Sequence, residues 1–359
     1  SPYIRDESVD ENLYFPPAPG QTFHVAGGYD PLELYKSKKH KDPDYISAML
    51  SNLTALASAY RGDHAQTRVP TICIPHGIVT DGGFAMLLGS YVMATRETCF
   101  RILNPSRGLT LDPVGLSFLL PRLGVEFQQQ SSKFMGCGMI LALMGYEANC
   151  MDMLETGLVT HYMESPESIG LLESTLAEIR PWNQQELIKN PARLYGDGPP
   201  QVDHNASFRN VQVADAVHCF SSARADTLDI WSYDEHHFEI EDPSLETDPV
   251  PWHEDRVSCL VDYAATFDEV FRRNDSLQGI LEGFRTIADG ETKDPAEHEC
   301  IEIAKHFVER LETQSPLALS VTHRLLQLSI LDGEESLKNC ADREHRAQTA
   351  LLGKEDFER

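Results

Sequence analysis

Residues 69–124 read VPTICIPHGIVTDGGFAMLLGSYVMATRETCFRILNPSRGLTLDPVGLSFLLPRLG, and the rest of the chain is organised around them. The short apolar, β-branched run 69–76 predicts a buried strand. Gly77 ends it, and 81–83 (Asp-Gly-Gly) begins a helix. A glycine turn at a helix N-terminus directs free backbone N–H groups at one spot, which suits an anion or a developing oxyanion. A tight connection with no chemistry is the alternative.

Three segments of this stretch carry a resemblance. They are GIVTDGGF (77–84), YVMATRETCF (91–100) and NPSRGLTLDPVGLSF (104–118). They resemble the crotonase (enoyl-CoA hydratase/isomerase) superfamily, and within it the 3-hydroxyisobutyryl-CoA hydrolase branch. That branch has G-I-x-M-G-G-G-V, V-A-T-E-R-T-x-F and M-P-E-T-x-I-G-x-F-P-D-V-G-G-S. The resemblance covers about residues 22–180 and 257–359. It implies an α/β crotonase-like spiral of repeated ββα units with C-terminal helices.

Composition sets outer limits on the function. The chain has 359 residues, of which 41% are hydrophobic and 24% charged, as in ordinary globular proteins. No apolar run reaches the ~18 residues of a membrane span, so no membrane is expected. The net charge of −26 opposes broad attraction to nucleic acid. The eight cysteines form no CxxC pair, which predicts reduced thiols in a cytosolic or matrix-like compartment. Because residue 1 is not Met, we expect a leading segment to have been removed or left out.

The order of segments predicts four parts. Residues 1–21 are polar and Pro-rich and predict an N-terminal arm, 22–195 the crotonase-like core, 196–256 an acidic insertion, and 257–359 a helical region. Helical spacing is clearest in 45–60, 165–195 and 301–311, and Ser315-Pro316 predicts a helix start. The D-E-H-H run in the insertion could hold a metal, but its spacing fits no standard ligand set. We expect an acidic surface and no metal.

The resemblance implies an oxyanion hole with two halves. FHVAGGYD (23–30) resembles the family's F-C-A-G-G-D, which assigns the first N–H donor to Ala26 or Gly27, with Tyr29 as an extra residue. The second donor maps to Gly82. The first Gly of the family's G-G-G is Asp81 here, which puts a negative side chain where the oxyanion would form.

The carboxylates that the family uses for catalysis are altered. Aligning N-P-S with M-P-E places Ser106 at the catalytic Glu, and serine cannot replace a carboxylate base. Asp112 precedes Pro113, the reverse of the family's P-D. Asp44 stands at the substrate-contacting Glu of the family's E-E-Y, although a helix-capping role is the interpretation we favour. His161 falls on a strand that is structural in the family. The resemblance therefore implies a kept fold and a lost hydrolase activity.

Three functions stay open: a catalytically degenerate structural subunit, an active acyl-CoA hydrolase, and an acyl-CoA binding module. Some mitochondrial ribosome small subunits carry a protein resembling this hydrolase, so the resemblance implies mitochondrial ribosomal partners and a matrix location. No cofactor is expected, apart from a coenzyme A thioester if the pocket is open. Lys36, Lys38, Lys39 and Lys41 form a basic run that could contact phosphate or peripheral rRNA, or be a solvated loop.

Overall fold

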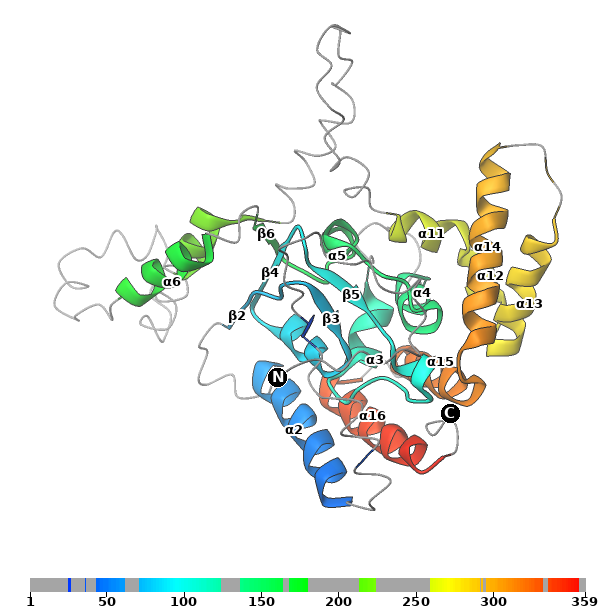
Figure 1. Ribbon diagram of the computed structural model, residues 1–359, viewed down its shortest axis with the longest axis horizontal. Helices are drawn as coiled ribbons and strands as arrows, with labels where there is room; N and C mark the ends of the chain where they lie inside the picture. Colours follow the sequence, from blue (N-terminus) through cyan, green and yellow to red (C-terminus); the bar gives the residue numbers. More distant parts are fainter. Residues whose placement is uncertain are drawn as a thin grey trace, which may run out of the picture.

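The computed structural model describes residues 25–26, 36, 43–61, 71–123, 136–163, 168–179, 213–223, 259–290, 292, 295–331 and 335–354. A central region of strands is flanked by helices, and most of the C-terminal helices gather on one side (Figure 1). This arrangement confirms the predicted α/β class with a helical C-terminal region.

The strands form two small sheets. They are β1 (Val25–Ala26), β2 (Ile72–Cys73), β3 (Ile78–Thr80), β4 (Tyr91–Thr95), β5 (Cys99–Arg101), β6 (His161–Met163) and β7 (Ser222–Ala223). The first sheet has the order β1-β3-β5 and the second β2-β4-β6-β7. The pairings between these strands are parallel except that of β6 with β7.

The helices account for most of the remaining described chain. The α-helices are α2 (Pro43–Arg61), α3 (Leu116–Leu119), α4 (Gly136–Met144), α5 (Cys150–Thr156), α6 (Ser168–Glu178), α11 (Leu260–Thr266), α12 (Asp268–Arg273), α13 (Leu277–Ala288), α14 (Pro295–Thr313), α15 (Pro316–Leu331) and α16 (Leu337–Leu352). Among the described residues, three 3₁₀ helices, η2 (Asp81–Leu88), η3 (Asn104–Arg107) and η4 (Leu120–Arg122), follow strands or extend α3.

The predicted strand over 69–76 is corrected in one respect. The chain forms β2 and then, after Pro75 and Gly77, a second strand β3 in the other sheet. Proline lacks the N–H that a continuous ladder needs, and Gly77 has a φ of 77°, which favours glycine. Within the run 69–76, only Ile72–Cys73 is therefore a strand, and the strand that leads into the 3₁₀ helix η2 is β3, which follows Gly77 in the other sheet.

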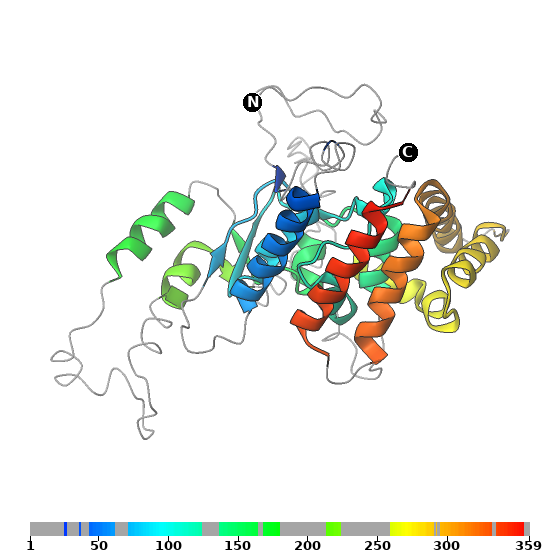
Figure 2. The ribbon, with the colours of Figure 1, turned by 90° about the horizontal axis from the view of Figure 1, so that it is seen from below.

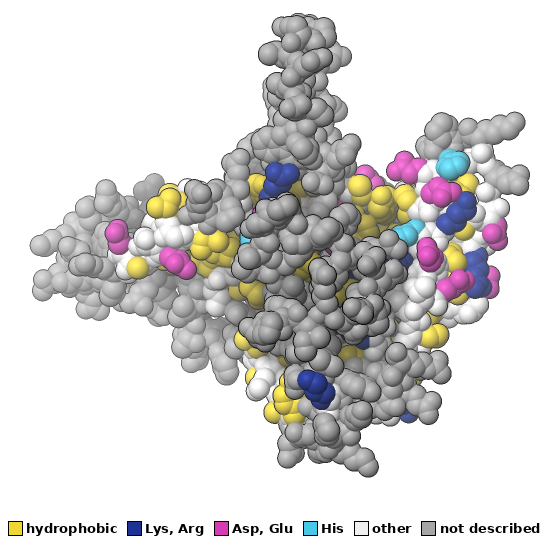
Figure 3. All heavy atoms as spheres, in the orientation of Figure 1, with side chains coloured by type: hydrophobic (Ala, Val, Ile, Leu, Met, Phe, Trp, Pro, Cys, Tyr) yellow, Lys and Arg dark blue, Asp and Glu magenta, His cyan; other side chains and the backbone are white. Residues whose placement is uncertain are grey.

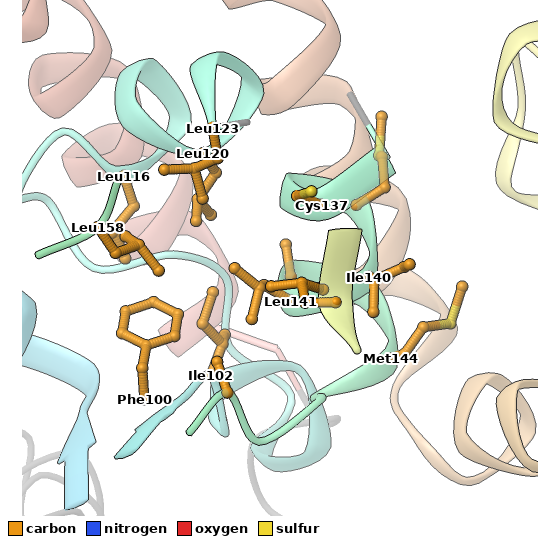
Figure 4. Close-up of a cluster of buried hydrophobic side chains, with 14 of the residues drawn as sticks. Phe100, Ile102, Leu116, Leu120, Leu123, Cys137, Ile140, Leu141, Met144 and Leu158 are labelled. Atoms are coloured by element: carbon orange, nitrogen blue, oxygen red, sulfur yellow. The ribbon is translucent and has the colours of Figure 1, made fainter. Parts of the chain in front are cut away.

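Helix α4 is the centre of the main core. All nine of its residues are buried, and its sequence GCGMILALM contains no charged side chain. Figure 4 shows Leu141 of α4 between Phe100 and Ile102 on one side and the helix carrying Leu120 on the other. A Cβ at Gly138 would lie 2.3 Å from the Leu120 carbonyl oxygen, so this packing requires glycine.

The C-terminal helices begin as the sequence predicts. Ser315 precedes α15, and its Oγ accepts the Ala318 N–H at 3.1 Å. Three phenylalanines join α12, α13 and α14, because the ring of Phe284 lies 5.6 Å from that of Phe271 and 5.4 Å from that of Phe307. The outer faces of α13 and α14 carry interspersed acidic and basic side chains (Figure 3). Helices α2 and α16 lie side by side (Figure 2).

Part of the region predicted as an insertion contributes to the fold. Residues 213–220 form a helix whose apolar side chains Val213, Ala216, Val217 and Phe220 pack with Met93 and Met163. Strand β7 then pairs with β6. The boundaries at 21, 195 and 256 stay predictions, and the arm 1–21 and the D-E-H-H run lie outside the described residues. Within the described chain, no helix has the length and hydropathy to cross a bilayer.

Candidate functional site

The three parallel strands of the first sheet lead into the segments that carry the predicted site residues. Ala26 pairs with Val79, and Thr80 pairs with Arg101, so the carboxyl ends of β1, β3 and β5 lie at one edge. Gly27 follows β1 directly but lies outside the described residues. The turn into η2 follows β3, and the η3 turn follows β5. This edge is the candidate site.

The η2 turn begins with a residue in an unfavourable conformation. Asp81 has a φ of 50° and is the one non-glycine residue with positive φ in the described chain. The left-handed region costs an L residue ~1–2 kcal/mol, although Asp tolerates it better than most. Asp81 is also only 3% exposed. Gly82, the second residue of η2, is buried beside it and belongs to the first turn, whose N–H groups have no partner within the helix.

Asp81 is bound to the neighbouring turn. Arg107 Nη1 donates to Asp81 Oδ2 at 2.6 Å, while Oδ1 is buried and accepts no hydrogen bond from the described residues. Burial raises the pKa of the Asp81 carboxyl above its ordinary value, although Arg107 acts in the opposite direction. The ion pair thus joins the predicted oxyanion turn to the turn that carries Ser106.

Ser106 is not buried beside the Asp81–Arg107 ion pair. Its side chain is exposed, and its Oγ donates to the Leu103 carbonyl at 2.6 Å. Asn104, two residues earlier, is 1% exposed, and its Nδ2 donates to the Thr110 carbonyl at 2.8 Å. The inward position of the η3 turn therefore belongs to Asn104.

The spacing of the family motif gives a second register that agrees with this burial. In M-P-E-T-x-I-G-x-F-P-D the Glu stands four residues before the Gly and eight before the Asp. Gly108 and Asp112 match that Gly and Asp, which puts Asn104 at the Glu, Arg107 at the Ile, and makes Pro113 the extra residue. Neither Ser106 nor Asn104 is a carboxylate. The assignment of either to the family's catalytic position stays a prediction.

Asp112 is held by the C-terminal helix α16. It is fully buried, and its Oδ1 accepts from Gln348 Nε2 at 3.1 Å. Gln348 Oε1 in turn accepts the Thr110 N–H at 2.9 Å, and the Thr110 and Thr322 hydroxyls are 2.8 Å apart. The same helix supplies Glu344. In this network the buried Asp112 side chain accepts a hydrogen bond from another part of the protein.

Glu344 completes the loop after Asp112. Its two carboxylate oxygens accept the N–H groups of Gly115 at 2.7 Å and Ser117 at 2.6 Å. Gly115 has a φ of 84° and no side chain with which to cap α3, so the capping group comes from α16. Complete burial raises the pKa of Glu344 to about 7, and the Ser117 and Gly115 hydrogen bonds oppose that rise. Sequence reasoning missed this residue.

The remaining predicted residues are only partly described. Ala26 and Gly82 lie at the same edge of the first sheet, and their role as oxyanion donors stays a prediction. The side chain of Asp44, in the first turn of α2, lies outside the described side chains. Lys36 is exposed, and Lys38, Lys39 and Lys41 lie outside the described residues. His161 is buried on β6, with its Nδ1 2.9 Å from Thr160 Oγ1 and its ring centroid 5.7 Å from that of Tyr91, the two rings being tilted by 59°.

The described part of the chain contains no group of side chains that could bind a metal ion, and its cysteines form no disulfide. No three His, Cys, Asp or Glu side chains gather there as a metal site requires. All eight cysteines are described and unbridged, and Cys73, Cys137, Cys150 and Cys340 are buried. Burial raises the pKa of the Cys137 thiol to about 12, which makes it inert rather than nucleophilic.

A profile of the enoyl-CoA hydratase/isomerase family matches residues 18–232, and the chain belongs to this family. The fold agrees: a carnitinyl-CoA dehydratase from Mycobacterium thermoresistibile superposes with a TM-score of 0.56 at 19% identity, covering 91% of this chain and 69% of that one. The spiral crotonase fold expected from the sequence is thereby confirmed.

Curated relatives narrow the resemblance within the family. The chain is 26% identical over 155 residues to the mitochondrial 3-hydroxyisobutyryl-CoA hydrolase of Homo sapiens, covering 43% of this chain and 36% of that protein. With the enzyme of Mus musculus the identity is 27% over 166 residues, covering 45% and 38%. The matched segment thus spans a little over a third of the length of these relatives. The relationship is distant.

Proposed function

We propose that this protein is a catalytically degenerate relative of 3-hydroxyisobutyryl-CoA hydrolase that serves as a structural subunit of the mitochondrial ribosome small subunit. The observation that carries the proposal is the η3 turn, where neither Ser106 nor Asn104 offers a carboxylate. Thioester hydrolysis by this family needs a general base at that turn, and removing such a base typically costs ~10²–10⁴ in rate.

Two further features support a loss of catalysis. Asp81 carries a buried carboxyl group next to Gly82, where a developing oxyanion would be repelled. Asp112 is engaged by Gln348 rather than left to act on a substrate. A family member that keeps the fold but lacks the catalytic general base can still act through the surface that it presents to other molecules.

The position in the assembly follows from charge. A protein with a net charge of −26 is repelled by an RNA interior, so we place it at the periphery, held mainly by neighbouring proteins. Lys36, Lys38, Lys39 and Lys41 would then face rRNA. The mitochondrial matrix location accords with the mitochondrial relatives.

The alternative is an active acyl-CoA hydrolase with a rearranged carboxylate. One observation favours it: Asp81 lies at the candidate site, and burial raises its pKa, as is typical of acid–base groups. A binding module that holds coenzyme A without turnover is the third possibility. Turnover and ligand-binding measurements, described below, separate these two from the structural role.

Sedimentation tests the ribosomal role. Mitochondrial lysate from cells expressing the tagged chain is centrifuged on a gradient at low and at high salt, and each fraction is probed for the tag and for small-subunit rRNA. We expect the tag to follow the small subunit at both salt concentrations, because protein contacts dominate. Migration wholly with free soluble enzymes would refute the proposal. A tagged 3-hydroxyisobutyryl-CoA hydrolase is the matched control and should stay unbound.

A further inference from the structure

Asp81 is energetically unfavourable in three respects. Its backbone adopts a positive φ of 50°, its carboxyl group is withdrawn from water, and Oδ1 has no hydrogen-bond partner among the described residues. Glycine would avoid all three. A residue that is unfavourable locally must be stabilised by a contact elsewhere, and Arg107 supplies it at 2.6 Å.

Asp81 and Arg107 both differ from the residues that the family motif has at their positions. Asp81 replaces the first Gly of G-G-G, and Arg107 replaces the Ile of I-G when Gly108 and Asp112 set the register. The two positions are 26 residues apart in the chain, yet they meet in one ion pair. A buried carboxylate introduced alone would leave an uncompensated charge, which is strongly destabilising. The two replacements therefore act as one unit.

The pair lies beside the predicted oxyanion turn. Asp81 immediately precedes Gly82, and Arg107, whose side chain is 34% exposed, reaches from η3 to Asp81 at the start of η2. A fixed negative charge beside the Gly82 N–H repels a carbonyl oxygen that carries partial negative charge. The hydrogen bond from Arg107 Nη1 to Asp81 Oδ2 and the permanent charge of the guanidinium hold the carboxylate in place.

We infer that Asp81 and Arg107 form a lock that ties η2 to η3 and excludes an acyl-CoA thioester from the candidate site. Asp81 is the blocking group, and Arg107 is the residue that positions it. The inference rests on the proposed loss of catalysis at this site, and it adds that the site is closed by two identifiable side chains. Removing the Asp81 carboxyl group opens the site, whereas removing Arg107 alone does not.

The test is a binding measurement on the full chain with acetyl-CoA as the probe. Isothermal titration calorimetry compares the native protein with Asp81→Gly, Arg107→Leu and the double variant, and thermal unfolding of each monitors the fold. The control is Asp268→Asn, which removes a negative charge from an ion pair with Arg272 at 2.7 Å on α12. It reports any gain that comes from net charge alone.

We expect no saturable binding by the native chain, with Kd above about 1 mM, and at least a ~10-fold lower Kd for Asp81→Gly and for the double variant. Arg107→Leu should lower Tm by ~3 °C or more without binding. The lock is refuted if folded Asp81→Gly does not bind, if the native chain binds equally well, or if Asp268→Asn matches Asp81→Gly. Sedimentation with the small subunit is measured separately, so a chain that gains acetyl-CoA binding but never follows the ribosome refutes the proposed function and leaves the lock intact.

Discussion

Glu344 Oε1 accepts the backbone N–H of Ser117 at 2.6 Å, so a side chain of the last described helix caps α3, about a third of the way along the chain. The second oxygen of Glu344 binds the Gly115 N–H, and no side chain of α3's own cap takes this role. Because this carboxyl group is fully buried, its ionisation is coupled to the stability of the loop between Asp112 and Ser117.

Replacing Glu344 by Gln should remove a pH dependence of stability. The pKa of Glu344 is raised to about 7 in the folded state from 4.5, so the folded protein holds this proton more tightly than the unfolded chain. Its contribution is fully present below pH 4.5 and is lost as pH rises towards 7, a change on the order of 3 kcal/mol. Urea unfolding at pH 5 and pH 7.5 should show this slope in the native chain and not in Glu344→Gln. Glu302→Gln, at an exposed pair, is the control.

Asp152 should contribute strongly to the stability of the contact between α5 and α11. Its Oδ1 accepts the N–H groups of Cys259 and Leu260 at 2.9 Å each, and Oδ2 accepts from Tyr146 and from the Asn149 N–H. Asp152→Ala leaves these donors without their acceptor and should cost about 3 kcal/mol in unfolding free energy. Tyr146→Phe removes one donor and should cost about 1 kcal/mol. Equal losses for the two variants would contradict this assignment.

Two glycines in helices should respond in opposite directions to the same substitution. Alanine favours a helix by ~1 kcal/mol over glycine. At Gly138 the added Cβ would lie 2.3 Å from the Leu120 carbonyl oxygen, so Gly138→Ala should destabilise by about 2 kcal/mol in spite of that gain. At Gly170 nothing lies within 4 Å, and Gly170→Ala should be neutral or stabilising. Thermal unfolding of the two variants makes the comparison, and a stabilised Gly138→Ala would show that α4 and η4 can separate.

The purified chain should not hydrolyse 3-hydroxyisobutyryl-CoA, and neither Ser106→Glu nor Asn104→Glu alone should restore turnover. Glu at 106 would project into solvent, and Glu at 104 would lose the donor that binds the Thr110 carbonyl. Release of free thiol, followed with a chromogenic disulfide, measures the rate. Turnover at ~1–10³ s⁻¹ by the native chain would show that another carboxylate, Asp81 first among the candidates, has taken the role.

Local signals in the sequence predicted the elements that local forces determine. The apolar spacing over 45–60 corresponds to α2 (Pro43–Arg61), and Ser315-Pro316 marks the start of α15 because Ser caps and Pro fits the first turn. The strand over 69–76 was placed less well. Only Ile72–Cys73 is a strand there, and the next strand, β3, begins after Gly77 in the other sheet. Which sheet each segment joins is not contained in any local pattern.

The site was predictable in part for the same reason. Gly82 and Ala26 were identified because glycine turns after strands are visible in a sequence, and Asp81 because it interrupts a glycine run. Arg107 was missed, although its charge at an apolar position before Gly108 was a usable signal. Gln348 and Glu344 could not be connected to Asp112 or Ser117, since nothing local joins residues more than 200 positions apart.

The hydrogen bonds between α16 and the loop around Asp112 also limit the order in which the molecule can assemble. Their partners are separated by 227 to 238 residues along the chain. Contacts of such high sequence separation form late, because closing a long loop has an entropic cost before any contact repays it. A growing polypeptide cannot complete this loop until α16 has been synthesised. The loop from Thr110 to Ser117 therefore becomes native only after α16 has joined it, and a nascent chain released before α16 would lack these contacts altogether.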